Sequence, residues 1–260
     1  MSTVQPAAPV ALLTGAAQGI GEATARLFAE RGYRLAALDI LDTGQQVCDE
    51  INQAGGVCQF YRCDTTDEAN VQETVAAAYA RFGRIDALLN IAGIVLVKPL
   101  SETSWEEYRR LVDVNLGGTF LLCRQVLPVM RAQQSGSIVN MASVSGHVGQ
   151  TNHALYGATK GAVLAFTRAL AWEAAGDNIR VNSLSPGSVD TPMLRADIKL
   201  ESQRTGLPFE EVKQLREGEQ AFKRWAHPRE IAEAVFFLAS NAASFMTGSD
   251  LLVDCGWVAK

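Results

Sequence analysis

Short apolar segments alternate with longer amphipathic segments along most of the chain. Seven short segments are rich in apolar residues and are typical of strands: 10–13, 33–39, 57–63, 86–90, 137–142, 179–184 and 250–254. The segments between them include apolar residues at helical spacing, notably in 22–31, 105–133 and 155–175. This alternation predicts an α/β fold, a doubly wound parallel sheet of about seven strands with helices on both faces.

A glycine-rich turn at 14–21 follows the first strand and opens the first helix. Gly15 suits the tight turn, Gly19 lets a ligand approach the backbone, and Gly21 allows the helix to pack closely on the strand. Glycines also occur in ordinary turns, so the informative feature is the position between a strand and a helix. In that position the helix amino end faces a bound diphosphate.

An acidic residue ends the second strand-like segment. Asp39 follows Gly21 by 18 residues, and a carboxylate at that distance can accept hydrogen bonds from both ribose hydroxyls of an adenosine. It would also repel a 2′-phosphate, and no Arg or Lys stands beside it. The pattern therefore favours NAD over NADP, the alternative being an acidic residue that only caps the strand.

Tyr156 and Lys160 are four residues apart in a segment expected to be helical, which places both side chains on one face. Ser143 follows the strand-like run 137–142, at its carboxyl end. The phenol of tyrosine has a pKa of about 10 in water, and a nearby ammonium favours the phenolate. We therefore expect Lys160 to lower the pKa of Tyr156 and make it a usable acid or base. Most chance copies of the Tyr-xxx-Lys spacing are ordinary surface residues.

Together these motifs resemble the short-chain dehydrogenase/reductase family from about residue 10 to the C-terminus. Further matches lie in family order: Asp64 after the third strand, Asn90-Ile91-Ala92-Gly93, Asn115, Pro186-Gly187, Thr191, Thr247-Gly248 and Val253-Asp254-Cys255-Gly256. Two positions depart from the family pattern. Ile91 replaces a second Asn, and Cys255 replaces a Gly and affects only the local turn.

The resemblance implies a Rossmann fold and hydride transfer between a secondary alcohol and NAD. Tyr156 would take the alcohol proton in oxidation and donate it in reduction, while Ser143 would bind the substrate oxygen. Lys160 would bind the nicotinamide ribose, and Asn115 would hold a water linking Lys160 to solvent. The resemblance extends the NAD-binding set to Gly15, Gln18, Gly19, Ile20, Gly21, Asp39, Asp64, Thr65, Asn90, Ala92, Gly93, Tyr156, Lys160, Pro186, Gly187, Val189 and Thr191. It also implies a homotetramer that pairs helices 105–133 and 155–175 together with the last helix and strand.

Composition agrees with one domain at 10–260, preceded by a frayed tail at 1–9 that lacks the features of a signal peptide. A net charge of −5 gives no support to nucleic-acid binding, and no apolar run approaches the roughly 20 residues of a membrane helix. Five cysteines, an odd number without a CxxC pair, predict reduced thiols and a cytoplasmic protein. Three scattered histidines predict no metal site.

Two stretches are expected to line the substrate pocket, 144–155 and a charged helical lid at about 188–224. Most lid charges are expected to form a solvated face, and Arg195 is the candidate to meet a polar substrate. The candidate substrate residues are Val95, His147, Gln150, Asn152, His153 and Met193. Their mixture suggests a polyol, a sugar-derived alcohol or a hydroxy acid.

Two alternatives stay open. A 3-oxoacyl-(acyl-carrier-protein) reductase would use NADPH and often has Asn before the catalytic Tyr, where this chain has Leu155. Asp39 also argues against NADPH. A nucleotide-binding sensor or scaffold without turnover is the other alternative, but such proteins commonly lose the Tyr or the Lys, and both are present here.

Overall fold

The computed structural model describes residues 8–260, so residues 1–7 of the expected tail lie outside the described residues. Seven strands form one parallel sheet in the order β3-β2-β1-β4-β5-β6-β7. They are β1 (Val10–Thr14), β2 (Arg34–Asp39), β3 (Val57–Arg62), β4 (Ala87–Asn90), β5 (Gly136–Met141), β6 (Ile179–Pro186) and β7 (Asp250–Val253). The α-helices are α1 (Gly19–Glu30), α2 (Thr43–Gln53), α3 (Glu68–Phe82), α4 (Trp105–Val112), α5 (Gly118–Gln133), α6 (Ala154–Ala174), α7 (Pro192–Thr205), α8 (Phe209–Gly218) and α9 (Pro228–Ala239). The predicted fold class is confirmed.

Local sequence signals set the ends of several helices. The Asp67 carboxylate accepts hydrogen bonds from the backbone N–H groups of the first turn of α3, at 3.0 and 3.1 Å. Gly83 ends the same helix in the left-handed conformation, with φ of 76°. Ser104 and Glu107 form a capping box at the start of α4.

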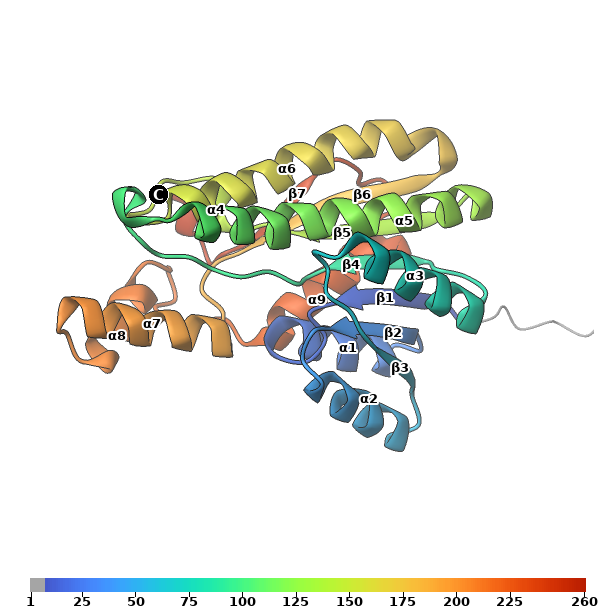
Figure 1. Cartoon of the computed structure of the whole chain (residues 1–260), viewed down its shortest axis with the longest axis horizontal. Coiled ribbons are helices and arrows are strands. Elements are labelled where there is room, and N and C mark those ends of the chain that lie inside the picture. The colour runs from blue at the N-terminus through green and yellow to red at the C-terminus, as the bar shows by residue number, and fades with distance from the viewer. Residues whose placement is uncertain (1–7) are drawn as a thin grey trace, which may run out of the picture.

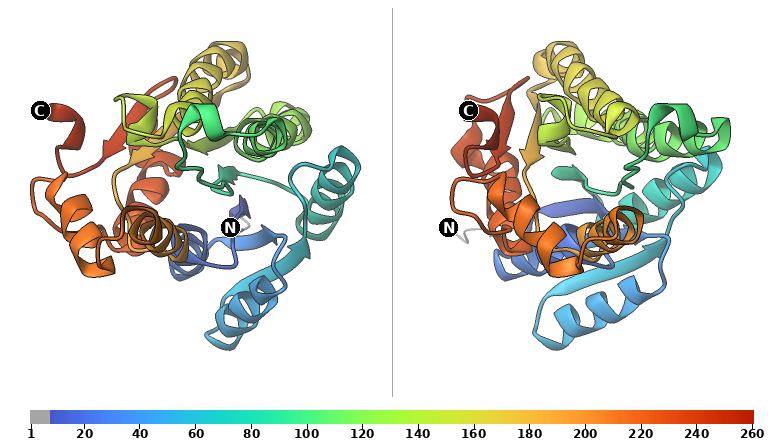
Figure 2. Two further views of the ribbon diagram at one scale, coloured as in Figure 1. Left: turned by 60° about the vertical axis from the view of Figure 1, so that its left-hand side comes forward. Right: turned by 90° about the vertical axis from the view of Figure 1, so that its left-hand side faces the viewer.

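Helices cover both faces of the sheet, as Figures 1 and 2 show. On one face, α1, α2 and α9 bury Phe28, Val47 and Val235 against the strands. On the other, α3, α5 and α6 bury side chains such as Val75 and Val126. Both layers are apolar and closely packed, so the sheet provides a rigid base for residues at its edges.

The order in which the strands are added to the sheet reverses beside β1. From β1 the chain runs outward through β2 and β3, and it then returns to β4 on the other side of β1. In open parallel sheets such a switch point leaves a crevice at the carboxyl ends of the strands. The helices α7 and α8, which connect β6 to α9, extend beyond the sheet at this end (Figure 1).

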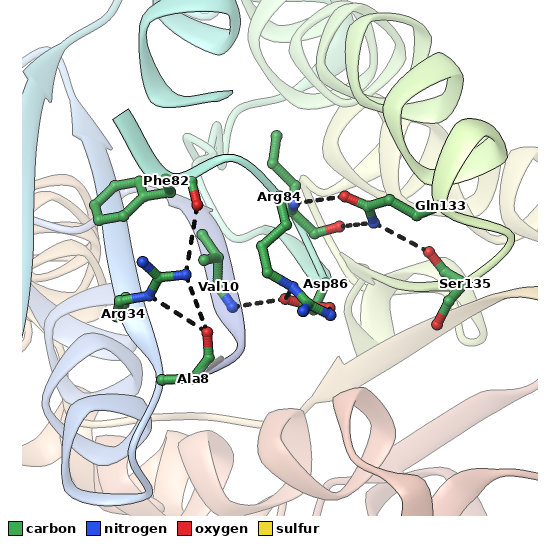
Figure 3. A network of polar contacts seen from close by, with 9 residues as sticks. Ala8, Val10, Arg34, Phe82, Arg84, Asp86, Gln133 and Ser135 are labelled. Atoms are coloured by element: carbon green, nitrogen blue, oxygen red, sulfur yellow. Dashed lines mark hydrogen bonds and ion pairs between the residues drawn. The ribbon is translucent and has the colours of Figure 1, made fainter. Parts of the chain in front are cut away.

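A polar network, drawn in Figure 3, lies at the amino ends of the strands, opposite the crevice. The Asp86 carboxylate accepts the backbone N–H of Val10 at 2.8 Å. The Gln133 side chain accepts the N–H of Ile85 at 2.9 Å and donates to its carbonyl at 2.8 Å, which ties the end of α5 to the start of β4. The Arg34 guanidinium donates to the carbonyl of Ala8 at 3.2 Å. These contacts satisfy backbone groups at the amino ends of the strands.

The segment 105–133, expected to be one helix, is divided into α4 and α5 by a π-helical turn at Asp113–Gly117. A π turn places an extra residue in the helix and is common at functional sites. The turn contains Asn115, which is almost fully buried. A simple 3.6-residue repeat gives no indication of such a turn.

The expectation that all thiols are reduced is contradicted by a disulfide between Cys48 and Cys58. Cys48 lies on the buried side of α2, and Cys58 lies on β3, against which α2 packs; their Cα atoms are 5.0 Å apart. The pairing depends on this contact between helix and strand, which the spacing of the cysteines does not indicate. Cys63, Cys123 and Cys255 are free thiols.

Candidate active site

The glycine-rich turn packs so closely on neighbouring backbone that it leaves little room for side chains. Gly15 and Gly19 have φ of 72° and 58°, which favour glycine. A Cβ on Gly21 would lie 1.8 Å from the carbonyl oxygen of Gly15, so only glycine lets α1 pack this closely on the turn. The Thr14 hydroxyl accepts the backbone N–H groups of Ile91 and Ala92, each at 3.1 Å, and so joins the ends of β1 and β4. The roles expected for the glycines are consistent with this geometry.

The glycine-rich turn lines a cleft, and Asp39 lines the same cleft. One carboxylate oxygen accepts the N–H of Ala17 and the other the N–H of Leu41, both at 2.9 Å. These contacts hold the carboxylate in place where it lines the cleft. Arg62 is paired with Asp39 in the register of β2 and β3, but its guanidinium lies 3.5 Å from the Asp42 carboxylate.

The cleft wall contains most of the expected cofactor residues. Besides Asp39 it is formed by Gly15, Gln18, Gly19, Ile20, Gly21, Asp64, Thr65, Ala92, Gly93 and Thr191. A turn closed to side chains, a helix amino end and a fixed carboxylate are the features that a diphosphate and a ribose require.

Asn90 lies behind the cleft rather than in its wall. It is buried, and its amide donates to the Asn140 side chain at 2.8 Å and to the Cys123 sulfur at 3.3 Å. Asn140 in turn donates to the Thr167 hydroxyl at 2.9 Å. Asn90 therefore links β4 to β5 and α5, and this internal position explains why it does not face the cleft.

A second pocket contains the expected reacting groups Ser143, Tyr156 and Lys160. Ser143 follows β5 and caps a short 3₁₀ turn by accepting the N–H of Ser145 at 3.2 Å. Tyr156 and Lys160 lie on one side of α6, with Lys160 Nζ 5.8 Å from the centre of the Tyr156 ring. Lys160 Nζ donates to the carbonyl of Met141 at 2.9 Å. The three residues thus come together from two elements.

Burial dominates the acid–base properties of this pocket. It raises the pKa of Tyr156 to about 12, and although interaction with Ser143 lowers that pKa, the charge of Asp197 raises it further. Burial lowers the pKa of Lys160 to about 8. The expected lowering of the Tyr156 pKa by Lys160 is not found, because the ammonium is directed to a backbone carbonyl and the phenol is desolvated.

Asn115 joins the π turn to the reacting groups. Its amide oxygen accepts the N–H of Ile94 at 2.9 Å, and its amide nitrogen donates to the Ile94 carbonyl and the Thr159 hydroxyl at 3.0 and 3.1 Å. A Cβ on Gly93 would lie 3.2 Å from Asn115 Oδ1 and 3.5 Å from Lys160 Nζ. Asn115 therefore lies beside Lys160, but its own hydrogen-bonding groups hold the segment after β4.

The expected substrate residues fall into two groups. Val95, Gln150, His153 and Met193 line the second pocket, as do the expected cofactor residues Pro186, Gly187 and Val189. His147 and Asn152 do not. His147 Nε2 lies 2.9 Å from the Asp250 carboxylate and 3.2 Å from the Ser185 hydroxyl, so the ring is turned toward β6 and β7. Asn152 has φ of 64°, and its carbonyl accepts the N–H of Lys98.

The pocket residues that the sequence prediction did not single out include Asp197 on α7, Arg216 on α8 and Trp257 near the C-terminus. Arg195, the candidate from the same lid, is half exposed and pairs with Asp190 at 2.6 Å outside the pocket. Asp197 and Ile198 are the only residues of α7 that are buried, although the helix contains several other charged residues and several other apolar ones. The sequence contained no signal for which charge points inward.

The two pockets share Ile20, Ile91, Gly93, Ile94, Thr191 and Met193 and so form one continuous cleft. A dinucleotide cleft that leads to a buried tyrosine, lysine and serine defines a nicotinamide-dependent oxidoreductase.

Comparisons with known proteins agree. A family model described as enoyl-(acyl carrier protein) reductase matches residues 15–258. The chain belongs to the short-chain dehydrogenase/reductase family. It is 41% identical to a cis-4-hydroxycyclohexanecarboxylate dehydrogenase of Sinomonas cyclohexanicum, over 96% of each chain. It is 39% identical to a cyclopentanol dehydrogenase of a Comamonas species, over 96% of this chain and 97% of the other.

Among solved structures, an actinorhodin polyketide ketoreductase variant with NADPH superimposes with a TM-score of 0.93. That protein is 32% identical in sequence, and the match covers 97% of this chain and 98% of the other. Across the described residues, 8–260, no helix is both long and apolar enough to cross a membrane.

Proposed function

We propose that this protein is an NAD-dependent dehydrogenase that interconverts a secondary alcohol and its ketone. The observation that carries the proposal is the continuity of the cleft: the pocket with Tyr156, Ser143 and Lys160 opens directly onto the groove with the glycine turn and Asp39. The substrate would be a polyol, a sugar-derived alcohol or a hydroxy acid. The similarity to dehydrogenases of cyclic secondary alcohols supports this class of substrate.

Each reacting group has a role that its position supports. Ser143 donates a hydrogen bond to the substrate oxygen and orients the alcohol. Tyr156 exchanges the alcohol proton, and Lys160, charged below its pKa of about 8, lies 5.8 Å from the ring centre, where its ammonium attracts a developing phenolate. A bound NAD, held by the glycine turn and Asp39, would supply the hydride acceptor. Asn115 acts as a positioning residue, since it holds the segment after β4 beside Lys160.

A fixed carboxylate supports the choice of NAD. Both Asp39 oxygens are held by backbone N–H groups, so the carboxylate cannot turn away from a 2′-phosphate without losing these bonds. An NADPH-dependent reductase of acyl-carrier-protein thioesters is the second candidate, and the match to the enoyl-(acyl carrier protein) reductase model and the similarity to a ketoreductase with NADPH favour it. Asp39 argues against this candidate.

Exposed aromatic side chains support a homotetramer. Trp172 on α6 is 88% exposed, and Trp105 on α4 and Phe120 on α5 also face outward. Apolar side chains this exposed favour burial against another chain. Light scattering of the purified protein measures the mass directly, and a monomer would contradict the proposed assembly.

The substitution Tyr156→Phe tests the proposed chemistry. Loss of the phenol removes the proton-transfer group, and we expect kcat to fall by about 10²–10⁴. NAD binding, followed by tryptophan fluorescence, should persist. Tyr79→Phe, a change on the exposed side of α3, is the matched control and should leave turnover intact. Turnover at the normal rate in Tyr156→Phe would refute the assignment.

A further inference from the structure

The substrate pocket contains a buried carboxylate whose capacity to accept hydrogen bonds is not taken up by the described part of the chain. Asp197, on α7, lines the pocket, and its side chain is nine-tenths buried. Within residues 8–260 it accepts no hydrogen bond, and its nearest cation is the guanidinium of Arg216, 3.9 Å away. A carboxylate accepts several hydrogen bonds, and its burial without them is costly. The site therefore favours a ligand that donates hydrogen bonds.

The Arg216 guanidinium is hydrogen-bonded to a different carboxylate, that of Glu201. Its Nε and one terminal nitrogen lie 3.1 and 2.7 Å from a single oxygen of Glu201. The Glu219 carboxylate lies 3.9 Å from the other terminal nitrogen. One guanidinium is thus surrounded by three carboxylates. An added anion would meet like charge here, so this end of the pocket disfavours a substrate carboxylate.

A second acceptor lies close to the catalytic tyrosine. His153 lines the pocket, and its ring centre is 6.2 Å from that of Tyr156. Its Nδ1 lies 2.8 Å from the carbonyl of Thr151, so Nδ1 carries the proton. Burial lowers the pKa of His153, which keeps the ring neutral and leaves Nε2 as an acceptor.

The pocket therefore contains two chemically different sets of polar groups. Ser143, Tyr156 and Lys160 supply the hydroxyl and ammonium groups of the reacting set. Asp197 on the lid and His153, which directly precedes α6, supply acceptors in the same pocket. Apolar side chains, among them Ile94, Val95, Met193 and Leu194, line the rest of the pocket. A neutral carbon skeleton that has a second hydroxyl matches this set of groups.

We propose that Asp197, together with His153, binds a second hydroxyl of the substrate, which makes the substrate a neutral diol or polyol rather than a simple alcohol or a hydroxy acid. Arg216 is a positioning residue that keeps the Asp197 side of the lid in place through Glu201. This assignment rests on the proposed dehydrogenase function and selects one of its substrate classes.

Three substrates with one ring size test the proposal: cyclohexanol, the isomers of cyclohexanediol and 4-hydroxycyclohexanecarboxylate. A hydrogen bond to a charged group is worth about tenfold or more in kcat/KM. We expect kcat/KM for the best diol isomer to exceed that for cyclohexanol by about tenfold, and the hydroxy acid to be the poorest substrate. Oxidation of cyclohexanol or the hydroxy acid in preference to every diol would overturn the proposal while leaving the dehydrogenase function intact.

The substitution Asp197→Asn assigns the effect to one side chain. It keeps the shape but removes the charged acceptor, and we expect the ratio of kcat/KM for the diol to that for cyclohexanol to fall about tenfold. The control is Glu210→Gln, an exposed carboxylate on the outer side of the lid, which should leave this ratio unchanged. An unchanged ratio in Asp197→Asn would reject the subsite. If no alcohol in the panel is oxidised with either cofactor, the proposed function itself fails, and the subsite with it.

Discussion

The substitution Asp39→Ala tests the reasoning on the cofactor most quantitatively. Asp39 would accept hydrogen bonds from the ribose of NAD and repel the additional phosphate of NADP. Its two oxygens are held by the N–H groups of Ala17 and Leu41 at 2.9 Å, so the carboxylate is fixed at the edge of the cleft. Removing it should weaken NAD binding and strengthen NADP binding together.

The size of the effect follows from two contributions. Two unit charges about 4 Å apart repel by about 1 kcal/mol in water and about 4 kcal/mol near a protein surface. The lost hydrogen bonds to a charged acceptor cost NAD about 1.5–3 kcal/mol. Because 1.4 kcal/mol corresponds to a factor of about ten, the ratio of kcat/KM with NAD to that with NADP should fall by at least about tenfold.

Initial rates of alcohol oxidation with each cofactor measure this ratio, with Asp49→Ala as the control. Asp49 is an exposed carboxylate on α2 outside the cleft, and its removal should leave the ratio unchanged. A preference for NADP in the unmodified protein would refute the argument. So would an Asp39→Ala variant that keeps the original ratio.

Two further predictions concern stability. Gly21→Ala should destabilise the protein by about 1–3 kcal/mol and weaken NAD binding, because its Cβ would lie 1.8 Å from the Gly15 carbonyl oxygen. The control Gly176→Ala, which has open space around it, should change neither stability nor NAD binding. Equal losses of stability in urea unfolding for the two variants would contradict the packing argument. Lys160→Met should abolish turnover yet stabilise the protein by about 1–3 kcal/mol at pH 7, since burial lowers the lysine pKa from 10.5 to about 8. The buried charge of Lys160 destabilises the unmodified protein fully below about pH 8 and no longer does so above the unfolded pKa near 10.5. The difference in stability between Lys160→Met and the unmodified protein should therefore shrink as the pH rises through that window. A difference that does not change with pH would contradict this explanation.

The sequence predicted the parts of the cleft that local spacing determines. Gly15, Gly19 and Gly21 lie within one turn, and Tyr156 and Lys160 lie one helical turn apart, so a short segment sets their geometry. The sheet was predictable for a similar reason, because buried strands and amphipathic helices alternate along the chain.

Features that depend on contacts between distant segments were not predictable. Asp197 faces the pocket while Arg195, two residues earlier, faces outward, and only the packing of α7 decides between them. His147 is drawn away from the pocket by Asp250, a residue 103 positions later. The pKa of Tyr156 rises because of burial, which the spacing to Lys160 does not reveal.

The most direct test of the proposed function is the formation of NADH with a panel of secondary alcohols. The panel should contain polyols, sugars, hydroxy acids and simple cyclic alcohols, each with NAD and with NADP in parallel. The account predicts turnover with NAD, strongest for neutral substrates that have a second hydroxyl. No turnover across the panel, together with reduction of an acetoacetyl thioester by NADPH, would contradict it and favour the reductase of acyl-carrier-protein thioesters.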